Sequence, residues 1–195
     1  LQGLGARLSW WQWQPPRAGD WPARGALFRS FFEDGADILA RQVSQEALLD
    51  GIRRAAPSYD LVITDFAAPE MPQGALFEDL GRYNPSIVIA NADHFGRHGP
   101  YARWAGDELT DYAMGGYWSL GGEMGRAPLR VPGRQAQFHA GMQLAIAALA
   151  ARRYACVTGH GQEVEVSAAE AMLGAHWSTT VAWTHEGRIL QRAGC

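Results

Sequence analysis

Six histidines are the side chains in this sequence best suited to acid–base or metal chemistry: His94, His98, His139, His160, His176 and His185. His94 and His98 are four residues apart, a spacing that suits two metal ligands on one helix face. The Phe-Gly-Arg between them and the Gly-Pro after them disfavour a helix, so we expect no metal site. His139 and Ser167 could be combined into a triad, but no serine lies in a Gly-x-Ser-x-Gly turn, and hydrolase chemistry has little support.

Five arginines gather around two glycine-rich stretches: Arg97, Arg103, Arg126, Arg130 and Arg134. Guanidinium groups bind phosphate through two parallel hydrogen bonds, so one interpretation is a site for a phosphorylated ligand. Solvated surface arginines are the commoner alternative. All 17 basic residues are arginine, which excludes mechanisms that need a Schiff-base lysine. No Gly-x-Gly-x-x-Gly follows a strand pattern, and no phosphate loop with its lysine is present.

Length and composition indicate one globular domain. The chain has 195 residues, of which 47% are apolar and 19% charged, and its formal net charge of -3 argues against a nucleic-acid or anionic membrane partner. Cys156 and Cys195 are too few for a disulfide framework, which fits a reduced, cytoplasmic setting. No apolar run approaches the roughly 18 residues of a membrane span.

The elements that would position these residues alternate between strand and helix. Strand patterns cover residues 8–13, a short region from Phe31 to Leu39, residues 59–66 and residues 86–91, and helical patterns cover residues 45–55 (with Ser44 as N-cap) and 75–80. This order predicts parallel crossovers and an open α/β sheet. Ligands bind at the carboxyl ends of the strands in such sheets, so the loops at residues 65–74 and 93–107 are candidate sites.

The stretch from Pro128 to Leu173 follows a helix predicted near residues 108–116. It has an arginine-bearing loop, an alanine-rich helix at residues 137–153, a glycine turn, a strand at 164–166 and a helix at 168–183. The first helix has bulky apolar residues at helical steps, and we expect them to be buried in the core: Phe138, Met142, Ile146 and Leu149. Cys156 is expected between this helix and the glycine turn.

Five short motifs, in order along the chain, resemble the class III CoA-transferase family: Asp65-Phe66, Asn84-Pro85, Phe95-Gly96-x-x-Gly99-Pro100-Tyr101, Pro128-Leu129-Arg130-Val131, and Gly161-Gln162-x-Val164-x-Val166-Ser167-x-x-Glu170-Ala171. The family includes formyl-CoA, crotonobetainyl/carnitine and succinyl-CoA transferases, together with α-methylacyl-CoA racemase. Each motif alone is weak, but their order and spacing hold over most of the chain.

The resemblance implies a fold and a set of binding residues. The implied fold is α/β, a Rossmann-like open, mainly parallel sheet with flanking helices, which forms the family's large domain. Residues 1–195 would be a single partial large domain, without the family's first strand–helix unit and its small domain. The expected partners are CoA or an acyl-CoA thioester and either a second copy, as a homodimer, or a second CoA-transferase domain. The residues expected to bind the CoA ligand are Asp65, Phe66, Phe95, Gly96, Gly99, Pro100, Tyr101 and Arg130.

Three departures from the family pattern bear on activity. The aspartate that takes up the acyl group in the family's transferases corresponds to Gln137, and a glutamine amide is a poor nucleophile. No Asp or Glu lies between Glu123 and Glu163. The racemase histidine corresponds to Asp107, so both halves of that acid–base pair are absent. Where the family usually has Arg-Pro-Gly, this chain has Ala-Ala-Pro at residues 67–69.

We therefore expect a CoA-transferase-like domain that is catalytically degenerate on its own. An active transferase with altered chemistry is one alternative. Another is a non-catalytic interaction or scaffold module that uses the tryptophan-rich N-terminal edge: Trp10, Trp11 and Trp13.

Overall fold

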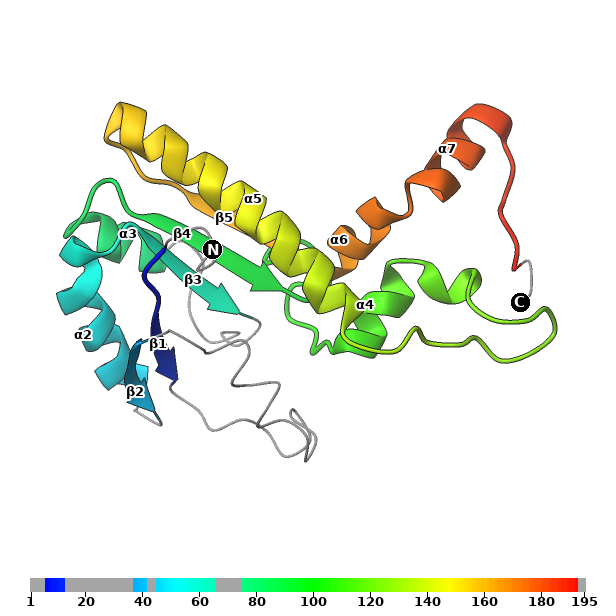
Figure 1. Cartoon of the computed structure of the whole chain (residues 1–195), viewed down its shortest axis with the longest axis horizontal. Helices are drawn as coiled ribbons and strands as arrows, with labels where there is room; N and C mark the ends of the chain where they lie inside the picture. Colours follow the sequence, from blue (N-terminus) through cyan, green and yellow to red (C-terminus); the bar gives the residue numbers. More distant parts are fainter. Residues whose placement is uncertain (1–5, 13–36, 42–44, 66–74, 193–195) are drawn as a thin grey trace. The chain divides into compact units, whose positions relative to one another are not determined.

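The computed structural model describes residues 6–12, 37–41, 45–65 and 75–192 (Figure 1). It divides the chain into two compact units, Leu1–Ser58 and Tyr59–Cys195. No helix among the described residues is both long enough and apolar enough to cross a membrane.

The first unit contains a small parallel sheet and one helix. Strand β1 (Ser9–Gln12) pairs with β2 (Asp37–Arg41), and the register shifts between Trp10 and Trp11. Helix α2 (Gln45–Ala55) has the predicted bounds, and a 3-10 turn, η2 (Ala56–Ser58), follows it. The first turn of α2 carries an acidic residue and its last turn carries two arginines. These charges are opposite in sign to the partial charges at the two helix ends and therefore stabilise the helix. The predicted cap at Ser44 and the strand region at Phe31 and Phe32 lie outside the described residues.

The second unit is built on a three-stranded parallel sheet in the order β3-β4-β5. The strands are β3 (Leu61–Asp65), β4 (Val88–Asp93) and β5 (Glu163–Ser167). All three were predicted, although β4 begins two residues later than the sequence pattern suggested. A Cβ at Gly161 would collide with the backbone of Ile87, and the Gly161 N–H donates to Pro85 O at 2.8 Å. Glycine is therefore required where the chain enters β5 beside β4.

Helices connect and follow these strands. Helix α3 (Ala75–Gly81) joins β3 to β4. Helix α4 (Glu108–Met114), the short turn η3 (Tyr117–Ser119) and the long helix α5 (Gln135–Thr158) lie between β4 and β5. Helices α6 (Ala168–Ala175) and α7 (Trp177–Glu186) follow β5. The predicted α/β class with a parallel sheet and flanking helices is confirmed.

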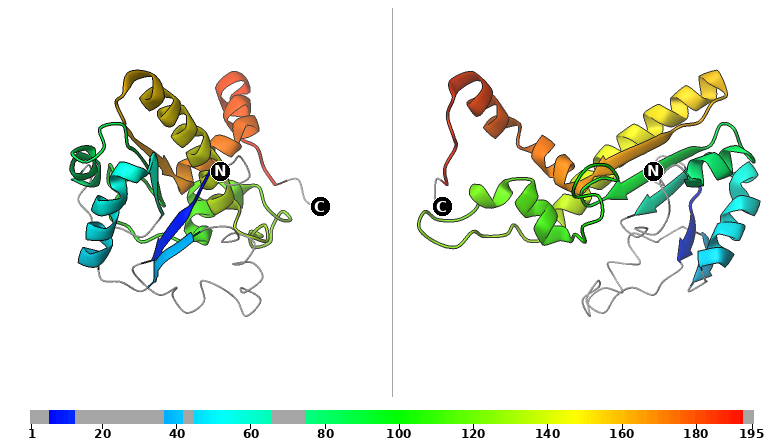
Figure 2. Two further views of the ribbon diagram at one scale, coloured as in Figure 1. Left: turned by 60° about the vertical axis from the view of Figure 1, so that its left-hand side comes forward. Right: turned by 180° about the vertical axis from the view of Figure 1, so that it is seen from behind.

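Helix α5 runs along one face of the sheet, as Figures 1 and 2 show from three sides. Its buried residues are mostly alanines: Ala136, Ala140, Leu144, Ala148, Ala151 and Ala155. The four from Leu144 onward pack against β4 and, in part, against the valines of β5. Ala136 and Ala140 pack instead against residues of α4 and α6. Small side chains on both surfaces let the helix axis approach the strands closely.

The expectation that the bulky residues of α5 form the core was wrong. Phe138, Met142, Ile146 and Leu149 are 41%, 56%, 70% and 47% exposed. They lie on the opposite side of the helix from the alanines, because a helix turns by 100° per residue and the two sets are offset by about half a turn. The alanine row, which has the same helical period, faces the sheet instead.

Two boundaries also differ from the sequence prediction. Helix α5 extends to Thr158, so Cys156 lies in its last turn, and Gly159 ends it in the left-handed conformation with φ of 75°. The single helix expected from Ala168 to Trp183 is broken at His176, which ends α6 and precedes α7. The His176 ring packs 3.6 Å from the Tyr117 ring and contacts the Thr179 hydroxyl at 2.8 Å. These tertiary and local contacts account for the break.

Candidate functional site

The candidate site lies at the carboxyl edge of the second unit's sheet, where β4 and β5 end side by side. His94 directly follows β4, and its carbonyl oxygen accepts hydrogen bonds from the Ser167 hydroxyl and the Ala169 N–H, both at 3.0 Å. Ser167 also caps α6 by accepting a bond from the Glu170 N–H. These bonds join the start of the loop after β4 to the start of α6.

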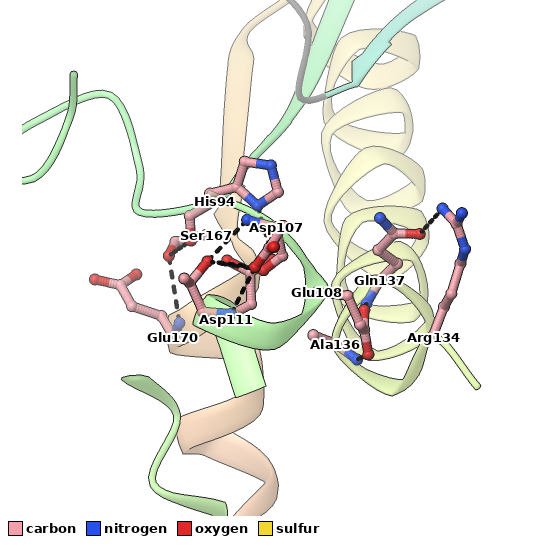
Figure 3. Close-up of polar contacts among 10 residues, drawn as sticks. His94, Asp107, Glu108, Asp111, Arg134, Ala136, Gln137, Ser167 and Glu170 are labelled. Carbon is pink, nitrogen blue, oxygen red and sulfur yellow. Dashed lines mark hydrogen bonds and ion pairs between the residues drawn. The ribbon is translucent and has the colours of Figure 1, made fainter. Parts of the chain in front are cut away.

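Gln137 lies in the first turn of α5 and is half-buried. Its side-chain carbonyl accepts a hydrogen bond from Arg134 Nη1 at 3.1 Å. Glu108 reaches across from α4, and its two carboxylate oxygens accept the Ala136 and Gln137 N–H groups at 2.9 and 3.2 Å (Figure 3). The positive end of α5 is thus neutralised by a carboxylate from another helix rather than by a side chain of its own.

A second acidic group lies three residues further along α4. Asp111 is fully buried, and its Oδ2 lies 2.7 Å from His94 Nδ1 (Figure 3). Burial raises the pKa of the Asp111 carboxyl above its ordinary value, although the contact with His94 opposes this shift. Asp107 caps α4, and the hydrogen bond from the Thr110 N–H lowers the pKa of its carboxyl. The two aspartates of this helix are therefore shifted in opposite directions by their surroundings.

Five of the expected ligand-binding residues share the loop after β4: Phe95, Gly96, Gly99, Pro100 and Tyr101. Gly96 and Gly99 have φ of 79° and 88°, a conformation that favours glycine. The Phe95 and Tyr101 rings meet edge to face at 6.5 Å, and Tyr101 in turn contacts Trp104 at 4.7 Å. The structure thus places this group of residues together.

The other three expected ligand-binding residues are less closely defined. Asp65 ends β3 beside Ala92 of β4, but its side chain is not described, and Phe66 lies outside the described residues. Arg130 is exposed, on the extended segment that leads to α5. The roles of all these residues, and of Gln137, stay predictions.

Most of the arginine cluster has protein partners. Arg97 binds Asp93 at 2.9 Å and Glu163 at 3.3 Å, and its N–H donates to Glu165. Arg126 pairs with Glu123 at 3.3 Å on the surface. Arg97 is therefore held by carboxylates at the sheet edge, which leaves Arg103 and Arg130 as the better candidates for a phosphate.

The histidines considered for metal or hydrolytic chemistry have other contacts. His98 is 83% exposed and lies 4.0 Å from Glu165. His139 Nδ1 contacts Gln135 O at 2.8 Å within its own helix. Within the described part of the chain, no group of three or more His, Cys, Asp or Glu side chains could hold a metal ion.

Sequence reasoning missed two features of the site, the Glu108 cap on α5 and the His94–Asp111 pair. The start of α4 at Glu108 was predicted, and the Asp-x-x-Thr pattern at residues 107–110 is a capping signal that agrees with it. Nothing in the spacing of His94 and Asp111 indicates that they meet, because 17 residues with an irregular loop separate them.

The fold and the site place this chain among α/β proteins with a parallel sheet and a polar carboxyl edge. Residues 43–195 match the family model described as CoA-transferase family III. The chain is 36% identical over 188 residues to the succinyl-CoA:(R)-benzylsuccinate CoA-transferase subunit BbsE of Thauera aromatica, covering 91% of this chain and 45% of that protein. The chain therefore belongs to CoA-transferase family III, as the sequence motifs indicated.

Two further comparisons agree. An acetyl-CoA:oxalate CoA-transferase of Acetobacter aceti is 26% identical over 207 residues, covering all of this chain and 52% of that enzyme. The crystal structure of a CAIB/BAIF family protein from Brucella suis superposes with a TM-score of 0.69 at 28% identity, covering 76% of this chain and 39% of that one. The chain thus spans about half the length of these curated relatives.

Proposed function

We propose that this chain is a CoA-transferase-family subunit that contributes to a CoA thioester site but supplies no acyl-accepting carboxylate of its own. The observation that carries this proposal is Gln137, which occupies the first turn of α5 at the position that the family resemblance assigns to the nucleophilic aspartate. The chain would correspond to part of the family's large domain and act in the cytoplasm.

The chemistry of the transfer explains why the substitution matters. In the reaction that the resemblance implies, a carboxylate oxygen attacks the thioester carbonyl, forms a mixed anhydride and releases the CoA thiolate. A neutral amide is a poor nucleophile and forms no exchangeable anhydride. The Gln137 carbonyl oxygen already accepts a bond from Arg134, and the neighbouring Glu108 carboxylate accepts two backbone N–H groups.

A role in binding CoA is supported by the loop after β4. Its aromatic and glycine residues lie at the carboxyl edge of a parallel sheet, where such folds bind their ligands. The relatives from Thauera aromatica and Acetobacter aceti are named as transferases that use succinyl-CoA and acetyl-CoA. By that likeness we propose a CoA thioester as the ligand of this chain.

A partner chain is the second part of the proposal. The relative from Thauera aromatica is described as a subunit, and a succinyl-CoA–L-malate CoA-transferase relative from Chloroflexus aurantiacus as an alpha subunit. The outer face of α5 exposes bulky apolar residues, and a helix that is apolar all round is normally covered. We propose that a second copy of this chain or a second CoA-transferase domain packs against the outer face of α5.

The central experiment restores the carboxylate. Gln137→Asp is incubated with succinyl-CoA or acetyl-CoA and then with hydroxylamine, and the protein is analysed by mass spectrometry. We expect a hydroxamate at residue 137 in the variant and none in the wild type. Gln143→Asp, at an exposed position six residues further along the same helix, is the matched control and should give none.

Two outcomes would count against the proposal. A hydroxylamine-sensitive adduct in the wild-type chain would show that it carries a nucleophile of its own. If calorimetric titration detects no CoA binding at millimolar ligand, the CoA role is excluded and the scaffold alternative is favoured. The tryptophans of that alternative, at residues 10, 11 and 13, lie outside the side chains that the structure describes.

A further inference from the structure

The loop from His94 to Gly106 closes on itself. It leaves the end of β4 and returns to the N-cap of α4, and a Cβ at Gly106 would collide with the His94 ring. The absence of a side chain at Gly106 therefore lets the two ends of the loop meet. Loops of this length with adjoining ends are compact units that often carry function.

The side chain of His94 is fixed from the opposite side by Asp111. The Nδ1–Oδ2 distance of 2.7 Å is that of a strong hydrogen bond, and Asp111 is fully buried. Its other oxygen, Oδ1, has no hydrogen-bond partner in the described structure. His94 is thus the side chain that pairs with this buried carboxyl group. Removing His94 alone would leave the carboxyl group buried without that partner and would lower the stability of the fold.

The main chain of His94 is held independently of its ring. Its carbonyl oxygen accepts from Ser167 and Ala169, at the start of α6. The next residue, Phe95, begins the group expected to bind the ligand, and its ring contacts Tyr101. His94 consequently links β4, α4 and α6 at the base of the loop that presents this group.

We propose that His94 and Asp111 are positioning residues, which close the loop at residues 94–106 and hold Phe95–Tyr101 ready for the ligand. The proposal rests on the proposed function, since it takes this loop to be part of a CoA thioester site. A ligand binds a preformed loop more tightly, because the binding free energy is not reduced by the free energy needed to order the loop.

The alternative is that His94 and Asp111 only satisfy each other's hydrogen bonds and do not hold the loop. If His94 and Asp111 only satisfy one another, replacing both by leucine removes the polar groups together and leaves the loop and its ligand affinity unchanged. If the bond closes the loop, the same double replacement loosens the loop although neither member of the pair is left facing a lost partner. The double variant His94→Leu/Asp111→Leu therefore separates the two roles.

The first measurement is amide hydrogen exchange of the free protein. We expect the amides of residues 95–101 to exchange roughly tenfold faster in the double variant, the effect of losing one hydrogen bond to a charged group. Exchange in α5 should be unchanged. His185→Gln, at an exposed histidine of α7 outside the loop, should leave the loop amides as in the wild type. Unchanged loop exchange in a folded double variant would overturn the proposal.

Asp111→Asn covers the case in which the double variant does not fold. Asparagine keeps an acceptor for His94 Nδ1–H, so we expect this variant to retain most of the loop protection. Exchange at residues 95–101 as fast as in the unfolded chain, with α5 still protected, would show that the hydrogen bond is not what closes the loop and would overturn the proposal.

The second measurement is CoA affinity by calorimetry. We expect the dissociation constant to rise roughly tenfold in the double variant and to stay unchanged in His185→Gln, at an exposed histidine of α7 outside the loop. If the wild type binds CoA and the double variant binds it equally well, the positioning role is overturned while the proposed function stands. If the wild type binds no CoA, the proposed function fails, and the exchange experiment still decides whether the pair closes the loop.

Discussion

At the scale of single residues, the three acidic side chains at residues 107, 108 and 111 differ in role because their surroundings differ. Glu108 lies against the first turn of α5 but caps backbone N–H groups. Asp111 is buried against His94, and Asp107 caps its own helix. None of these groups belongs to α5, where the family resemblance puts the acyl-accepting side chain, so the acidic residues described here stabilise the frame of the site.

The Glu108 cap gives a first stability prediction. Glu108→Gln removes the negative charge at the N-terminus of α5 and weakens two hydrogen bonds, so we expect the free energy of unfolding to fall by about 1 kcal/mol. Urea denaturation followed by circular dichroism measures the change. Glu78→Gln, on an exposed part of α3, is the control and should change stability by less than about 0.5 kcal/mol. Equal effects of the two substitutions would contradict the capping role.

His176 gives a pH prediction. Burial lowers the pKa of its imidazole below the ordinary 6.5, so the unfolded chain takes up a proton there at a higher pH than the folded chain. The His176 contribution to the unfolding free energy is therefore fully present above about pH 6.5 and is lost as pH falls toward the folded-state pKa. Thermal unfolding between pH 7.5 and 5.5 should show a weaker pH dependence in His176→Gln than in the wild type. His185→Gln, at an exposed histidine, should keep the wild-type dependence.

At the scale of elements, helix α5 has two apolar faces, one made mostly of alanines and one made of bulky side chains. Its alanine face lies against β4 and β5, and small residues on β4 match it. Its bulky face is exposed. A helix placed the other way round would hold its axis further from the sheet, so close packing selects the alanine face.

A pair of equal substitutions on α5 tests this orientation. Ala148 is fully buried, and Ala150, two residues later, is exposed. We expect Ala148→Leu to lower the free energy of unfolding by about 1–3 kcal/mol through overpacking, and Ala150→Leu to change it by less than about 0.5 kcal/mol. Chemical denaturation of both variants measures the difference. A larger effect at Ala150 would mean that α5 presents a different face to the sheet.

At the scale of the whole molecule, the outer face of α5 is an exposed apolar surface among the described residues. The chain spans 45% of the length of its relative from Thauera aromatica, so that relative has further polypeptide with which such a face could pack. A partner chain is the corresponding proposal for this protein. The helix is about 36 Å long, from 24 residues at about 1.5 Å each.

Self-association is the form of this proposal that can be measured directly. We expect light scattering after size exclusion to show a concentration-dependent dimer, because one helix face alone is smaller than a standard stable interface. Ile146→Glu, at the centre of the face, should give a monomer. Ile189→Glu is the control, since Ile189 is 68% exposed and Ile146 is 70% exposed. A wild-type chain that stays monomeric at high concentration would exclude a second copy as the cover.

The sequence alone determined the type and order of most elements described here, the parallel α/β class and the family. These follow from local patterns, such as the β-branched run of β3, the helical spacing of α2 and the glycine after α5, which act within a few residues. The prediction that Gln137 stands at the position of the family's acyl-accepting aspartate also came from the sequence, because it needs only the order of the motifs.

Only the tertiary structure decided which face of α5 is buried, where the helix after β5 breaks, and which acidic and basic groups meet. Both faces of α5 have the same helical period, so periodicity could not choose between them, whereas the alanine contacts with β4 do. His94 meets Asp111 because the loop after β4 folds back onto α4, and Glu108 meets the start of α5 because α4 and α5 pack together. Such contacts depend on the path of the chain in space, which residue types and spacing do not specify.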